Sequence, residues 1–162
     1  MKRRFLLLTA AIVGITALFL ASQIYAGTKV DEVIKLADPA YEKHKKGIVE
    51  FTHKKHQDEY AKKFPEFYKL GCGECHHDKD NKPLSNLKEG DDVQRCIECH
   101  KIPSEAPKGR KAKEKLTKKE KIKDYHAEAL HDNCRGCHRK VNKKTKKRAA
   151  PTTCTKCHPK TK

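Results

Sequence analysis

Apolar residues are concentrated near the start of the chain and are sparse after it. The one long apolar run spans residues 5–21 and follows three basic residues. Residues 24–26, directly ahead of Gly27, are small or are tolerated at the cleavage site of a signal peptide. A basic start, an apolar stretch and such a site are typical of a secretory signal peptide. We therefore expect residues 1–26 to be a signal peptide and residues 27–162 to form the mature domain.

An uncleaved membrane anchor is the alternative for the apolar run. The run is slightly shorter than the roughly 20 residues that a spanning helix needs, and Thr9, Gly14 and Thr16 interrupt it. We favour cleavage, and only an uncleaved segment would place the protein at a membrane. Either way the rest of the chain is exported, to the periplasm if the source is bacterial.

Beyond the first 26 residues the apolar pattern predicts only short elements. Residues 28–36 have apolar side chains at near-helical spacing, ended by Asp38-Pro39. The β-branched residues of 47–52 predict a strand or extended segment. Residues 57–70 predict one or two helical turns interrupted at Pro65.

Lysine and glutamate dominate much of the second half of the chain. Residues 111–123 predict a helix-like segment, which is either solvated surface or a docking face for a partner. A second basic stretch follows at 139–148. No composition shift marks a boundary within 44–158, so we expect one domain.

The composition argues against an ordinary apolar core. Charged residues make up 36% of the chain, aromatic residues 6%, and the mean hydropathy is −0.92. Such a chain buries too little apolar area to offset its conformational entropy. Without residues 1–26, 35 Lys and Arg face 21 Asp and Glu, a formal charge of +14. For an exported chain with few aromatic side chains for base stacking, this charge indicates an acidic protein partner and no nucleic acid.

All eight cysteines belong to Cys-x-x-Cys-His pentapeptides, the attachment signature of c-type haem. The two thiols bind the porphyrin and the histidine becomes an axial ligand of the iron. Four copies predict four covalent haem c groups, which could also supply the missing core. The motifs are Cys72, Cys75 and His76; Cys96, Cys99 and His100; Cys134, Cys137 and His138; and Cys154, Cys157 and His158.

Zinc sites and disulfides are the alternatives for eight cysteines in Cys-x-x-Cys pairs. Neither explains why histidine follows the second cysteine in every motif. We therefore favour haem.

The sixth ligand of each iron must come from elsewhere in the chain. His77 directly follows His76, so it cannot reach the opposite face of the same haem. His53 and His56 stand three residues apart and should serve two irons, which brings two haems close together. The histidines outside the motifs are His44, His53, His56, His77, His126 and His131.

These motifs together resemble the class III cytochromes c over roughly residues 48–158. The resemblance rests on Phe51–His56, on Cys72–His77 and on the His131-Asp132 pair before the third motif, and is greatest to the tetrahaem cytochromes c3. It implies a small, mainly α fold with much irregular structure, a core formed by four covalent haems, and scope for a short N-terminal β-hairpin.

The resemblance also implies which histidines are the distal ligands. His126 is a rival of His131, and the Asp132 that follows His131, as in the family, favours His131. His44 lies outside the pattern and is expected at the surface. The implied pairs are His76 with His53, His100 with His77, His138 with His56 and His158 with His131.

Two imidazoles on every iron would leave no position for a substrate, so we expect an electron carrier and no enzyme. The resemblance implies low-potential electron transfer in anaerobic respiration, with a periplasmic hydrogenase, formate dehydrogenase or membrane redox complex as partner. The basic stretches near the third and fourth motifs predict docking at the fourth haem.

Two other functions remain open. A membrane-anchored tetrahaem quinol dehydrogenase would carry its first motif close behind the anchor, whereas 50 residues separate Ala21 from Cys72 here. An enzyme or gas sensor would leave one haem five-coordinate.

Overall fold

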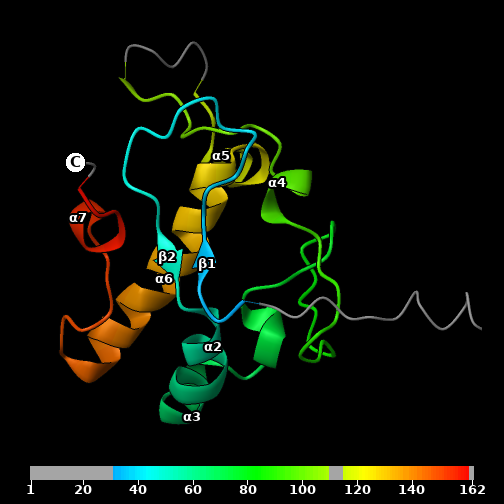
Figure 1. Cartoon of the computed structure of the whole chain (residues 1–162), viewed down its shortest axis with the longest axis vertical. Helices are drawn as coiled ribbons and strands as arrows, with labels where there is room; N and C mark the ends of the chain where they lie inside the picture. The colour runs from blue at the N-terminus through cyan, green and yellow to red at the C-terminus, as the bar shows by residue number, and fades with distance from the viewer. Residues whose placement is uncertain (1–30, 110–114, 161–162) are drawn as a thin grey trace, which may run out of the picture. The chain divides into compact units, whose positions relative to one another are not determined.

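A computed structural model describes residues 31–109 and 115–160 (Figure 1). The elements and contacts below lie within one compact unit, residues 31–89 with 93–160. Residues 90–92 belong to a separate unit, where Gly90 has a φ of 93°. The predicted signal peptide lies outside the described residues. Within them, no helix has the length and apolar character needed to cross a membrane.

A two-stranded antiparallel sheet opens the described chain. Strands β1 (Ile34–Lys35) and β2 (Glu50–Phe51) pair with Ile34 opposite Phe51. The helix predicted over 28–36 is wrong for its described part, because β-branched side chains there favour extended backbone and pair with β2. The strand predicted within 47–52 and the short N-terminal hairpin are confirmed.

Three short helical pieces, continuous with one another, begin one residue after β2. They are α2 (His53–Lys55), the π-helical η1 (His56–Tyr60) and α3 (Ala61–Lys63). Phe64 then leaves the helical region at φ −135°, and Pro65 begins the 3₁₀ turn η2 (Pro65–Phe67). Proline lacks the N–H that a continuing helix would need, so the predicted interruption is confirmed.

Helix α5 (Lys118–Asp124) begins at a capping box. The Thr117 hydroxyl accepts from the Glu120 N–H at 3.2 Å, and the Glu120 carboxylate accepts from the Thr117 N–H at 2.7 Å. The helix predicted over 111–123 is confirmed from Lys118; residues 115–117 are not helical, and 110–114 lie outside the described residues.

The longest described helix is α6 (His126–Thr145), which packs on α4 and α5 (Figure 1). It contains the whole third motif and ends at Lys146, whose φ of 54° is left-handed. Its sequence holds many good helix formers, including Ala127, Leu130 and Lys140. Sequence reasoning did not predict this helix, because its sequence has cysteines and histidines where an amphipathic helix would have apolar residues.

Very little of the described chain is buried. Ala106, 3% exposed, is the buried hydrophobic residue of the described part, and His126, 7% exposed, is its buried polar residue. Large apolar side chains such as Leu70 and Ile102 are exposed. The expected fold class is confirmed as far as its helices, irregular segments and short sheet. These elements are not held together by an apolar side-chain core.

Candidate cofactor centres

Each Cys-x-x-Cys-His motif forms one helical turn. The first lies in the 3₁₀ helix η3 (Gly71–Glu74), the second in α4 (Cys96–Cys99), the third within α6 and the fourth in α7 (Cys154–Cys157). In the three motifs outside α6 the histidine N–H donates to the carbonyl of the first cysteine, at 2.7–2.9 Å. Residues three and four apart on a helical turn share one face. Both thiols and the imidazole of each motif therefore reach the same side.

The structure brings the histidines together in four pairs. Each motif histidine lies beside one histidine from outside the motifs, and all eight predicted ligands take part. The ring-centre separations are 6.3 Å for His53 and His76, 6.1 Å for His56 and His138, 5.9 Å for His77 and His100, and 6.4 Å for His131 and His158.

These separations fit two imidazoles on opposite sides of one metal ion. A metal–imidazole bond is about 2.0 Å long, and the atoms of a five-membered ring with bonds of about 1.35 Å lie about 1.1 Å from its centre. Two such ligands in line would place their ring centres about 6.2 Å apart. Aromatic pairs without a metal have ring centres about 4.5–7 Å apart, so the assignment to one metal ion rests on the distance together with the pairing of every motif histidine with one other histidine. The residues present therefore fit a haem iron with two axial histidines.

Backbone carbonyls select the ring nitrogen that is left for a metal. In five of the eight ligand candidates Nδ1–H donates to a main-chain carbonyl, which leaves Nε2 with its lone pair free. The bonds run from His56 to Thr52 (2.9 Å), His77 to Asp78 (2.8 Å), His100 to Lys123 (3.0 Å), His138 to Pro151 (2.7 Å) and His158 to Gly47 (2.8 Å).

Burial disfavours the protonated form of several of these imidazoles. It lowers the pKa of His76, with further lowering from the nearby His53 and His77. Burial also lowers the pKa of His138 and His131. A neutral imidazole can coordinate a metal, whereas a protonated one cannot.

Gly47 carries one of these carbonyls at a close approach of two chain segments. A Cβ on Gly47 would lie 2.0 Å from the Pro159 carbonyl oxygen and 3.0 Å from Pro159 Cγ. Backbone cannot yield to such an overlap as a flexible side chain could. The glycine therefore lets residue 47 lie against the segment just after the fourth motif, where its carbonyl accepts from His158.

We expect Gly47→Ala to push this segment away and break the His158 hydrogen bond. The cost should be about 1–3 kcal/mol of unfolding free energy, as for overpacking elsewhere, and one haem signal should change. Guanidinium unfolding and electron paramagnetic resonance (EPR) would measure both effects. Gly136→Ala, in the third motif, is the control, because a Cβ there meets nothing within 4 Å. Equal effects of the two substitutions would contradict the role assigned to Gly47 in holding its carbonyl against His158.

Asn142 positions the main-chain carbonyl that accepts from the histidine of the third motif. Its amide donates to the Ala150 carbonyl at 2.9 Å, and its carbonyl accepts from the Ala150 N–H at 3.0 Å. This two-point contact folds the segment after α6 back along the helix. The neighbouring Pro151 carbonyl is thereby held against His138.

The third motif lies close to each of the other three. The Asn133 side chain donates to the Cys75 carbonyl at 3.2 Å, which joins the first and third motifs. Burial, followed by the nearby Cys134 and Cys137, raises the pKa of Cys75 to about 12. Burial, followed by Cys96 and Cys157, raises that of Cys134 to about 11. The third motif, on helix α6, is therefore the one that lies near each of the other three motifs.

His126 and His44 lie in a different cluster. Nδ1 of His126 is 3.0 Å from the Tyr41 hydroxyl, and the His44 ring stacks on Tyr41 at 5.4 Å and 19°. His44 is exposed, as predicted. The ring beside His158 belongs to His131, the preferred candidate.

Sequence reasoning missed Gly47, Asn142 and the Tyr41–His126 contact. Gly47 and Pro151 act through main-chain carbonyls, which no residue-type pattern reveals. It also missed that Asp132 pairs with Lys118 at 2.6 Å. An ion pair between two helices leaves no signal in the residue spacing of either one.

Comparison with known proteins gives one family. The model of the class III cytochrome C family matches residues 30–158, which include all four motifs and all eight ligand candidates. No curated protein and no solved structure matches the chain.

Proposed function

The chain belongs to the class III cytochrome c family of covalent haem c electron carriers, and from this premise we propose that it is a periplasmic, low-potential electron carrier with four haems. The observation that carries the proposal is the set of four histidine pairs, each at a separation suited to one iron. Each pair joins a motif histidine to one from outside the motifs. The number of pairs equals the number of attachment motifs.

Haem c supplies an iron that alternates between Fe(III) and Fe(II). The cysteines of each motif would hold one haem, and the two imidazoles would fill both axial positions. With both positions filled by these histidines, neither oxygen nor a substrate would reach the metal. The residues would then allow electron transfer without bond chemistry, as expected of a carrier.

The packing of α6 supports exchange among the four centres. Its motif lies near the other three through Cys134, Cys137 and Asn133. The π-helical segment that begins at His56 follows α2 directly, so His53 and His56 tie the first and third centres together. An electron that enters at one centre would have a short route to the others.

The proposed partners are acidic redox proteins, such as a periplasmic hydrogenase, a formate dehydrogenase or a membrane redox complex. The formal charge of +14 after removal of residues 1–26 would accelerate encounter with an acidic surface. Exposed lysines and arginines beside the third and fourth motifs, such as Arg139, Lys140 and Lys156, favour docking near the fourth haem. Added salt should slow such an encounter.

The test is a haem count together with EPR of the oxidised protein. We expect four haems per chain and four low-spin irons, because each iron would carry two strong-field imidazoles. The mass of the purified protein gives the haem count and its first residue at once, and a start at Gly27 is expected. A high-spin iron would instead support an enzyme or gas sensor with an open site, and a retained N-terminus would support a membrane-anchored protein.

A further inference from the structure

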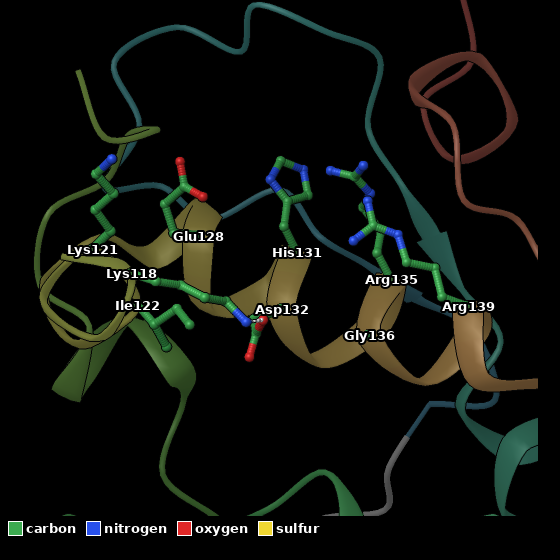
Figure 2. Close-up of a pocket in the computed structure, with 9 residues that line it drawn as sticks. All are labelled: Lys118, Lys121, Ile122, Glu128, His131, Asp132, Arg135, Gly136 and Arg139. Atoms are coloured by element: carbon green, nitrogen blue, oxygen red, sulfur yellow. Dashed lines mark ion pairs between the residues drawn. The ribbon is translucent and has the colours of Figure 1, made fainter. Parts of the chain in front are cut away.

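Arg135 occupies the first variable position of the third motif, yet its side chain lies with a ligand of the fourth centre. It stands four residues after His131 on α6, so the two share one helix face. Both line a cavity of about 180 Å³ between α5 and α6. Figure 2 shows the two side chains on the same side of the helix, with Arg139 reaching back toward Arg135.

The Nε atom of Arg135 is buried and has no hydrogen-bond partner within residues 31–109 and 115–160. The carboxylates that line the same cavity are engaged elsewhere. Asp132 pairs with Lys118 at 2.6 Å, and Glu128 accepts from the Ala106 N–H at 3.3 Å. A buried donor on a charged group is costly to leave unpaired. The arrangement therefore calls for an acceptor, and a negative one.

Arg135 lies beside one half of the fourth centre. It stands one helical turn after His131 on α6. The centre of the His131 ring lies 6.4 Å from that of His158, the histidine of the fourth motif. The guanidinium is therefore placed near the predicted distal ligand of the fourth haem.

We propose that Arg135 is the electrostatic partner of the haem held by the fourth motif, donating from Nε to a carboxylate of that haem and raising its reduction potential. The inference rests on the proposed function. A haem carries two propionate carboxylates, which are the acceptors that a guanidinium pairs with best. A positive charge near the iron favours Fe(II) over Fe(III), because reduction adds one electron and lowers the charge at the metal. Arg135 keeps its proton throughout, and no bond to it forms or breaks.

Potentiometric titration of the holoprotein and its variants tests this role. The haem bound by His131 is first identified as the one whose EPR signal changes in His131→Met. Arg135→Gln should then lower the potential of that haem, reducing its equilibrium constant for reduction about tenfold, which is about 59 mV for one electron. The other three potentials should shift less.

Two further variants separate this effect from a general change of charge. Lys156→Gln removes the same charge from an exposed position within the fourth motif, where solvent screens it, so its shift should be smaller. Arg135→Lys keeps the charge but loses the Nε donor, and should give a smaller downward shift than Arg135→Gln.

The outcomes are distinct. If Arg135→Gln shifts the His131 haem no more than Lys156→Gln does, or shifts all four haems equally, the inference is overturned. If Arg135→Gln is not obtained with four haems, Arg135→Lys decides, and an unchanged potential in it overturns the inference. A wild-type protein with fewer than four haems would instead contradict the proposed function itself, since the haem count does not depend on Arg135.

Discussion

Replacing His131 with methionine is expected to alter one of four low-spin EPR signals and leave the other three in place. His131 and His158 are the pair with ring centres 6.4 Å apart, so the substitution would change only the fourth iron from two imidazoles to one imidazole and one thioether. Methionine ligation raises the potential of a haem. We expect a rise on the order of 0.1 V, well within the roughly 0.8 V that axial ligands control. EPR and potentiometry would measure the two effects.

His126→Gln is the matched control. His126 lies five residues earlier on the same helix, is more deeply buried and has its Nδ1 beside the Tyr41 hydroxyl. Its loss should lower stability by about 1–3 kcal/mol, because a buried hydrogen bond is lost, without changing any haem signal. The assignment would be refuted by the reverse pattern, in which the glutamine variant alters a haem signal and His131→Met alters none.

The second large effect concerns the chain without its haems, which we expect to be mostly unfolded. Among the described residues, Ala106 and His126 are the buried hydrophobic and buried polar side chains, so apolar burial cannot offset the entropy of folding. Helix α6, at 20 residues, would lose the tertiary contacts from which most helical stability in proteins comes. Far-ultraviolet circular dichroism of chain produced without haem attachment should show most of the helical signal lost.

Adding Zn²⁺ to the haem-free chain provides the control for the alternative cofactor. Zinc bound by the paired cysteines would restore helical structure, as it does in small zinc domains. We expect no such recovery. Cooperative unfolding of the haem-free, zinc-free chain would show that the side chains suffice for folding and would contradict this account.

Sequence reasoning was strongest where chemistry depends on residue type. The Cys-x-x-Cys-His motifs could be found by inspection, and the proposed pairing of His53, His56, His77 and His131 names the rings that the structure brings together. The ligand assignment itself stays a prediction until the haems are observed. Pro65 was also informative, because its missing N–H acts locally.

Sequence reasoning was weakest where tertiary partners decide the structure. Ile34 and Lys35 form a strand because β2 lies beside them, although their neighbours have helical spacing. Helix α6 was missed because its sequence carries cysteines and histidines where a pattern search expects apolar residues. The Lys118–Asp132 ion pair joins two helices and has no sequence signature.

The main-chain acceptors of the histidine Nδ1 atoms have a consequence for how this protein responds to its surroundings. A carbonyl has no ionisable proton, so the acceptors that orient His56, His138 and His158 do not change with pH, as a carboxylate acceptor would. Most side-chain replacements at the residues that supply the carbonyls should also leave these hydrogen bonds in place. Gly47 is the exception, because of its approach to Pro159. The predicted ligand geometry therefore does not depend on the protonation of its acceptors, and surface lysines can change to suit a different partner without altering the predicted axial ligands.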